Sequence, residues 1–201
     1  ALAEIGAAFR VAGLPLVLLK GAALLLTTYA RPALRPMSDL DLLVDPRQLG
    51  EAAAILRKLG MGQPIVDPGQ GGKGLATAGK TCEDVYVGVE LHTDLFETGF
   101  PASMSLQDLS AEPLAFRVGP EGPTAHTLGT EDLIWHLCEH LRFHTTVFLP
   151  WRLIWMVDIV AVAEGRAGSV DWGKVRDRYP SVLRTLSLVD CLCPLGDSTR
   201  E

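Results

Sequence analysis

Residues 37–44 place two carboxylates in an otherwise apolar strand pattern, and this segment constrains the fold more than any other. Side chains alternate along a strand, so Asp39 and Asp41 share one face and the core-forming residues share the other: Leu40, Leu42 and Val44. Alternate residues lie about 6.5 Å apart, which lets both carboxylates reach metal ions spaced about 4 Å apart. Because buried carboxylates need a cationic partner, the segment predicts a sheet strand beside a metal site.

The preceding segment predicts a strand, a glycine turn and a helix. Residues 15–19 are apolar and of strand length, Lys20-Gly21 follows at once, and an Ala/Leu-rich stretch then predicts a helix through Tyr29. The free N–H groups at the start of such a helix can receive phosphate oxygens. Two prolines in residues 31–36 end the helix and make this segment a connection, which carries Arg31 and Arg35.

A later strand supplies a third acid. Residues 84–95 alternate clearly, with Glu90 and His92 on the polar face. Glu90 would complete a metal site with Asp39 and Asp41, since magnesium prefers hard oxygen ligands. His92 either orients Glu90, touches the acceptor, or has a purely structural role.

The remaining pattern predicts an α+β fold: a mixed β-sheet core flanked by helices, then a mainly helical portion. We expect domains at residues 1–120 and 121–201, the second contributing to the acceptor side. The glycine-rich residues 62–79 predict a loop or distorted hairpin. Helices are expected at residues 1–12, at 46–59 after an Asp45 cap, at 130–143, at 151–164, and at 175–192 with a break at Pro180.

Several motifs together resemble an uncharacterised nucleotidyltransferase family of the polymerase-β-like superfamily. The resemblance covers nearly the whole chain and rests on Leu18-Leu-Lys-Gly-Ala-Ala-Leu24, Tyr29, Arg35, Ser38-Asp-Leu-Asp-Leu-Leu-Val44, Val89-Glu-Leu-His92 and Trp155-Met-Val-Asp158-Ile. It implies metal-dependent transfer of a nucleoside monophosphate from a nucleoside triphosphate, such as ATP, to a hydroxyl acceptor. Asp39 and Asp41 would hold Mg²⁺, as one ion or two, with Mn²⁺ able to substitute. Glu90 would be the third acid and would help activate the acceptor.

The chain departs from the superfamily where the helix opens. The superfamily has Gly followed by Ser or Gly, whereas this chain has Lys20-Gly21-Ala22. Lys20 either compensates as a point charge on the phosphates or marks a changed donor or a weakened activity. Arg35 either binds phosphate oxygens or forms a salt bridge with Asp39 or Asp45.

Composition limits the binding partners and the cellular location that we expect. The net charge of −6 and the scattered Lys and Arg residues leave no basic stripe for a long duplex nucleic acid. Four cysteines without a C-x-x-C pair favour reduced thiols and a cytoplasmic location. No apolar run predicts a membrane span, and no secretory leader is visible. The acceptor is left open between a small molecule, a protein and an RNA end, and neither the base nor the oligomeric state is predicted.

Two other motifs offer rival functions. His136-Leu-Cys-Glu139-His140 matches the inverted zincin pattern, with His144 one turn later, but a zinc metallopeptidase also needs a third ligand. The run Gly71-Gly-Lys73-Gly74 lacks both the first glycine and the Ser or Thr of a phosphate loop. A third alternative is a catalytically weak relative that binds nucleotide or a protein partner.

Overall fold

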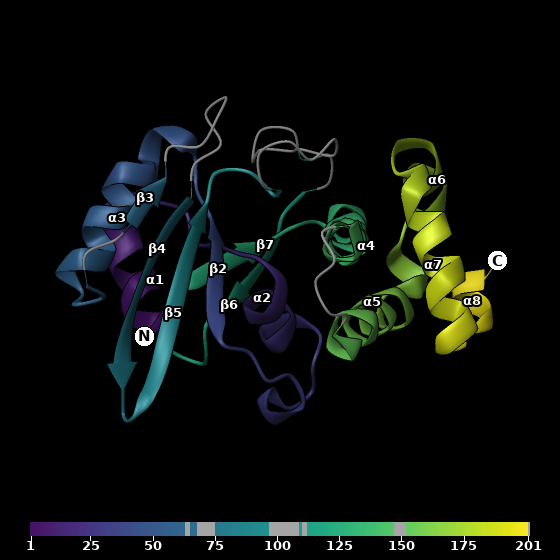
Figure 1. Ribbon diagram of the computed structural model, residues 1–201, viewed down its shortest axis with the longest axis horizontal. Coiled ribbons are helices and arrows are strands. Elements are labelled where there is room, and N and C mark those ends of the chain that lie inside the picture. Colours follow the sequence, from purple (N-terminus) through teal and green to yellow (C-terminus); the bar gives the residue numbers. More distant parts are fainter. Residues whose placement is uncertain (63–64, 68–74, 97–108, 110–111, 147–151, 201) are drawn as a thin grey trace. The chain divides into compact units, whose positions relative to one another are not determined.

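The computed structural model describes residues 1–62, 65–67, 75–96, 109, 112–146 and 152–200 (Figure 1). It divides into two compact units. The first comprises residues 1–109 and 113–127, and the second comprises residues 110–112 and 128–201.

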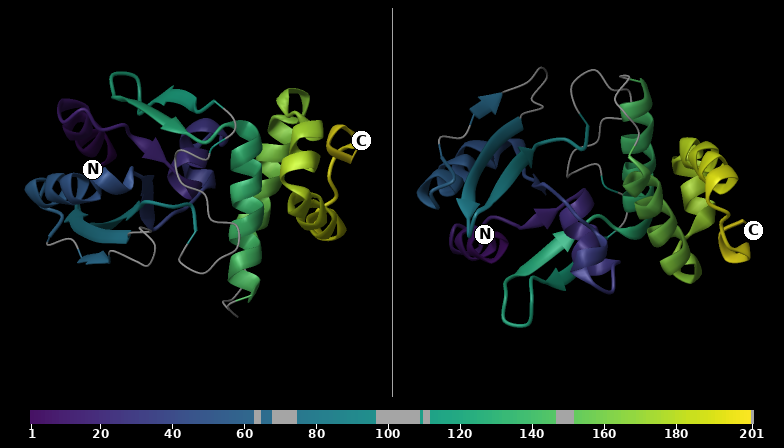
Figure 2. Two further views of the ribbon diagram at one scale, coloured as in Figure 1. Left: turned by 90° about the horizontal axis from the view of Figure 1, so that it is seen from above. Right: turned by 60° about the horizontal axis from the view of Figure 1, so that its bottom comes forward.

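The first unit is built on a mixed sheet of seven strands, in the order β3-β4-β5-β2-β1-β7-β6. Strand β2 pairs with β5 in parallel orientation and with β1 in antiparallel orientation. On its other side, β1 pairs with β7 in parallel orientation. Figure 2 shows the β6–β7 hairpin and the β3–β4 hairpin at opposite edges of this sheet. The strands are β1 (Val17–Leu18), β2 (Asp39–Leu43), β3 (Ile65–Asp67), β4 (Leu75–Cys82), β5 (Val85–His92), β6 (Leu114–Arg117) and β7 (Thr124–Thr127).

The helices of the first unit begin and end close to the predicted positions: α1 (Leu2–Val11), α2 (Lys20–Thr27) and α3 (Leu49–Lys58), with short 3₁₀ helices η1 (Pro32–Leu34) and η2 (Pro46–Gln48). The predicted cap at Asp45 is confirmed, because its carboxylate accepts a hydrogen bond from the Arg47 backbone N–H at 2.8 Å. The capped segment is a 3₁₀ turn that leads into α3, so the helix itself starts three residues later than predicted.

The core of this unit lies against one face of β2. Helices α1 and α3 pack against each other, and α3 also contacts β4 and β5. The predicted inward face of β2 is confirmed, because its side chains join those of α1 and α3 in one buried cluster that includes Leu40, Leu42, Val44, Ile5, Phe9 and Leu56. The opposite face of β2 carries Asp39 and Asp41 together with the buried Leu43.

Two hairpins extend the sheet on the β5 side. The predicted alternative of a distorted hairpin holds in the described part of residues 62–79, where β3 pairs with β4 in antiparallel orientation. The Gly71–Gly74 run lies outside the described residues. Strands β4 and β5 are joined by Glu83 and Asp84, whose φ angles of 48° and 65° place both in the left-handed region. Such a two-residue turn matches the right-handed twist of the strands.

The β6–β7 hairpin was not predicted from the sequence. Each of these strands has four residues, which is too short for alternation to be distinguished from an irregular segment. Strand β7 is placed by tertiary pairing instead, since the His126 backbone N–H donates to the Leu16 carbonyl at 2.8 Å.

The second unit is helical, as predicted: α4 (Thr130–Thr146), α5 (Leu153–Gly165), η4 (Ala167–Ser169), α6 (Trp172–Arg178), α7 (Pro180–Leu192) and α8 (Asp197–Arg200). The predicted break at Pro180 separates α6 from α7. Tyr179 at this break donates a hydrogen bond from its hydroxyl to the buried Asp132 carboxylate at 2.5 Å, and its ring stacks on Trp135. None of the helices in the described ranges has the length and apolar character needed to cross a bilayer.

The β4–β5 turn yields a stability prediction. Residues with a Cβ atom are disfavoured in the left-handed region, and Asn-Gly is the preferred pair in turns of this type. Replacing Glu83→Asn and Asp84→Gly together should raise the free energy of unfolding by about 1 kcal/mol. Urea denaturation followed by circular dichroism measures this change. Thr81→Gly, inside β4, is the control and should be destabilising; equal stability of the double variant and the wild type would contradict the turn geometry.

Candidate active site

The pairing of β2 with β5 brings the predicted acids together. In this parallel pair Asp41 lies opposite Glu90, and Asp39 lies opposite Gly88. Neighbouring strands are about 4.8 Å apart, so side chains on one face at paired positions are close neighbours. His92 follows two residues after Glu90 on β5 and therefore shares its face.

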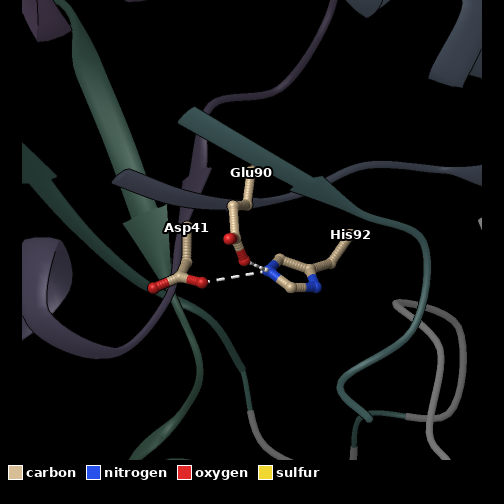
Figure 3. A group of neighbouring side chains, drawn as sticks. All are labelled: Asp41, Glu90 and His92. Atoms are coloured by element: carbon tan, nitrogen blue, oxygen red, sulfur yellow. Dashed lines mark hydrogen bonds and ion pairs between the residues drawn. The ribbon is translucent and has the colours of Figure 1, made fainter. Parts of the chain in front are cut away.

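Asp41, Glu90 and His92 form a compact group (Figure 3). The His92 Nε2 atom lies 2.9 Å from Asp41 Oδ1 and 3.3 Å from Glu90 Oε2. One potential ligand atom from each of the three residues lies within 4.8 Å of the others. No second group of three metal-ligating side chains is this close anywhere in the described ranges.

Lys20, the first residue of α2, contacts the same group with its side chain. Its Nζ atom donates to Asp41 Oδ1 at 2.8 Å, so this oxygen is contacted by both Lys20 and His92. The Asp41 side chain is only 7% exposed and that of Lys20 is 21% exposed. Lys20 also has a φ angle of 45°, which is unusual for a residue with a Cβ atom.

These contacts shift the pKa values of the group. Burial raises the pKa of Asp41, but the hydrogen bond from His92 and the charge of Lys20 outweigh it and hold this pKa far below its usual range. The hydrogen bond from His92 also lowers the pKa of Glu90. Burial lowers the pKa of His92, yet its bonds to Asp41 and Glu90 raise it overall. Without a metal ion, an imidazolium between two carboxylates is therefore favoured.

Asp39 lies at the start of β2, outside this group of three. Burial raises its pKa first, and the negative charges of Asp41 and Glu90 raise it further. Ser38 donates a hydrogen bond to its Oδ1 at 3.4 Å. Three carboxylates thus face one ammonium and one imidazole, and the cluster keeps a net negative charge even when His92 is protonated.

Arg35 and Gly21 meet at the first turn of α2. A Cβ atom on Gly21 would lie 3.3 and 3.4 Å from the two terminal guanidinium nitrogens of Arg35, and 3.4 Å from Met37 Cβ. Arg35 is only 7% exposed and donates to the Pro36 carbonyl at 2.6 Å. The buried guanidinium of Arg35 therefore lies beside the start of α2, in close contact with the position of Gly21.

Comparison with known proteins decides the family. The family model described as "Uncharacterised nucleotidyltransferase" matches residues 1–189. The chain belongs to this nucleotidyltransferase family. A similar fold occurs in the crystal structure of ANT(2")-Ia in complex with adenylyl-2"-tobramycin, with a TM-score of 0.56 and 19% identity over 92% of this chain and 94% of that one. Among curated proteins, no sequence matches this chain.

Among the described residues of this nucleotidyltransferase, the histidines of α4 do not form a comparable site. Glu139, the acid of the H-x-x-E-H pattern, is paired with Arg142 at 2.7 Å. His140 and His144 contact each other at 3.0 Å between their Nε2 atoms, and both rings lie against Trp155. Within the described part of the chain, His136 and His140 have no third ligand close enough to form a metal site. These contacts give the metallopeptidase hypothesis no geometric support.

One feature of the site was partly foreseen from the sequence, and another was not. His92 was assigned an accessory role, although its place two residues after Glu90 already put it on the same strand face. The Lys20–Asp41 ion pair was not predicted at all. It depends on the β1–β2 register, in which the Leu19 backbone N–H donates to the Asp41 carbonyl at 2.9 Å, and no local pattern encodes that register.

The Lys20–Asp41 pair predicts a measurable energetic coupling. Lys20→Met should lower the free energy of unfolding by about 2–4 kcal/mol, because it leaves a buried carboxylate with fewer partners. In a double-mutant cycle with Asp41→Asn, measured by urea denaturation in a chelator, the coupling should be about 1–3 kcal/mol. Lys80 and Glu4 provide the matched control, since their Nζ–Oε2 distance is 2.9 Å but the Glu4 side chain is 55% exposed. That pair should couple much more weakly; additive effects of the Lys20 and Asp41 changes would contradict the prediction.

Proposed function

We propose that this chain transfers a nucleoside monophosphate from a nucleoside triphosphate to a hydroxyl acceptor in a reaction that depends on a divalent metal. The observation that carries the proposal is the register of β2 with β5. It sets Asp41 opposite Glu90 in a group with His92, beside the Lys20-Gly21 start of α2. Membership of the nucleotidyltransferase family supports the reaction class.

The chemistry of the donors fits a divalent cation. Asp39, Asp41 and Glu90 offer carboxylate oxygens, which suit Mg²⁺ and Mn²⁺, and the imidazole of His92 suits Mn²⁺ better than Mg²⁺. The net negative charge of the cluster also favours binding of a divalent cation. A bound metal would neutralise charge on the phosphates and favour deprotonation of the acceptor hydroxyl.

The residues of the protein bind the phosphates and accept the proton of the acceptor hydroxyl. Lys20, Arg35 and the free N–H groups around Gly21 bind the phosphates of the nucleotide. Glu90, whose side chain is 37% exposed, accepts the proton of the acceptor hydroxyl, and His92 orients its carboxylate through the 3.3 Å contact. The acceptor oxygen bonds to the α-phosphorus, the bond from that phosphorus to the bridging oxygen breaks, and pyrophosphate leaves.

A small hydroxylated molecule is the acceptor class that we propose first. The structurally similar ANT(2")-Ia was crystallised with adenylyl-2"-tobramycin, a small molecule that carries an adenylyl group. The net charge of −6 also favours a small acceptor over a long nucleic acid. The same comparison makes ATP the first nucleotide to test. An intracellular nucleotide and four free cysteines favour the cytoplasm as the location.

The proposal is tested by incubating the protein with each of the four nucleoside triphosphates and Mg²⁺ or Mn²⁺, reading thermal shift and pyrophosphate release. Asp39→Asn, Asp41→Asn and Glu90→Gln should each reduce pyrophosphate release on the order of a hundredfold or more, because each removes an interaction needed in the transition state. Glu51→Gln, at an exposed position of α3, is the control and should leave release unchanged.

Survival of nucleotide binding and turnover in an Asp39→Asn, Asp41→Asn double variant would contradict the proposed function. A thermal shift without pyrophosphate release would favour instead a relative that binds nucleotide and does not transfer it. The occupation of Asp41 by Lys20 is the observation that favours this second function. Stoichiometric zinc in purified protein, lost on replacing His136 and His140 by Ala, would restore the peptidase alternative.

A further inference from the structure

We infer that Lys20 is an internal counter-cation that occupies Asp41 until a nucleotide binds, and that this exchange makes divalent metal and triphosphate bind cooperatively. The inference rests on the proposed function and adds a mode of regulation to the same site. In the free protein the ammonium of Lys20 neutralises Asp41. In the loaded protein it moves to the phosphates and leaves the carboxylates to the metal.

The contacts of Asp41 show that Lys20 competes with a metal ion for the Oδ1 atom of this carboxylate. Its Oδ1 atom has Lys20 Nζ at 2.8 Å and His92 Nε2 at 2.9 Å, and a carboxylate oxygen offers two lone pairs. Metal–oxygen distances in proteins are about 2.0–2.6 Å, so a cation on this oxygen would lie within about 5 Å of the ammonium. Two positive charges this close in a buried site repel strongly, so Lys20 opposes binding of metal alone.

Lys20 is placed where its side chain can reach either the Asp41 carboxylate or the phosphates of a bound nucleotide. It is the first residue of α2, and the backbone of the preceding residue, Leu19, is held by two hydrogen bonds. The Leu19 N–H donates to the Asp41 carbonyl at 2.9 Å, and the Ala23 N–H donates to the Leu19 carbonyl. The four-carbon stem is flexible, and with 21% of its side chain exposed Lys20 can turn toward solvent at the helix start.

The backbone conformation of Lys20 supports a functional role for its side chain. A φ angle of 45° suits glycine and is disfavoured for lysine. Strained residues of this kind concentrate at functional sites. The same turn holds the Arg35 guanidinium next to Gly21, so a phosphate there would meet two cationic side chains.

Cooperativity follows from linkage. A triphosphate offers Lys20 a second anion, and departure of the ammonium leaves Asp41, Glu90 and Asp39 with less positive charge nearby. Their affinity for a divalent cation therefore rises, and by reciprocity the metal raises the affinity for the triphosphate. His92 is less able to exchange in this way, because both Asp41 and Glu90 hold it.

The experiment measures Mn²⁺ binding directly, without nucleotide, from the electron paramagnetic resonance signal of free Mn²⁺. Lys20→Met should bind Mn²⁺ about tenfold or more tightly than the wild type, because it removes the competing charge. Lys20→Gln, a second neutral variant, guards against a folding defect in the first. Lys80→Met is the control: Lys80 is also 21% exposed and pairs with a carboxylate, Glu4, at 2.9 Å. Its Mn²⁺ affinity should equal that of the wild type.

A second titration adds a non-hydrolysable ATP analogue. The Mn²⁺ that the analogue chelates in solution is measured without protein and subtracted. After this subtraction the analogue should tighten Mn²⁺ binding in the wild type, and this enhancement should be smaller in both Lys20 variants. Equal Mn²⁺ affinity in the wild type and the Lys20 variants would overturn the inference and leave the proposed function standing. Failure of every protein to bind Mn²⁺ at millimolar concentration, with and without the analogue, would overturn both. Tight binding that persists in a Lys20→Met, Asp41→Asn variant would place the ion elsewhere and also overturn the inference.

Discussion

The candidate site depends on the parallel register between β2 and β5. Leu40 and Leu42 point into the core from one face of β2, and a slip of one residue would exchange them with Asp39 and Asp41. Hydrophobic burial therefore fixes which face of β2 carries the carboxylates, and the observed register sets Glu90 opposite Asp41. The same packing that stabilises the sheet places Glu90 and His92 at the site, so the fold and the chemistry share one constraint.

Charge balance is the second constraint on this part of the sheet. A carboxylate as buried as Asp41 is tolerated only with close cationic or hydrogen-bonding partners, and Lys20 and His92 provide them. For Asp39 the charge of Lys20 compensates only in part, and its pKa is raised overall by burial and by the neighbouring acids. Lys20 and His92 thus neutralise Asp41, the most buried acid of this cluster, and the cluster keeps negative charge around Asp39. Such a distribution attracts a cation from solvent.

The sequence was most informative where the signal is local. Helical periodicity, the Asp45 cap and the break at Pro180 predicted most helices, and alternation predicted β2 and β5 with their polar faces. These patterns also named Asp41, Glu90 and His92 as neighbours. What they could not supply is pairing between distant segments: the four-residue strands β6 and β7, and the β1–β2 register that brings Lys20 to Asp41, are set by tertiary contacts. The closeness of Asp41, Glu90 and His92 was therefore predictable, but not the ion pair between Lys20 and Asp41.

The Lys20-Gly21-Ala22 sequence, which departs from the superfamily pattern of Gly followed by Ser or Gly, can now be interpreted from its contacts. Lys20 brings a positive charge to Asp41, and Gly21 lies beside the guanidinium of Arg35. A helix start that would otherwise rely on backbone N–H groups and a small hydroxyl gains two side-chain cations. Replacing Lys20 by glycine would remove one of them and leave Asp41 with fewer partners.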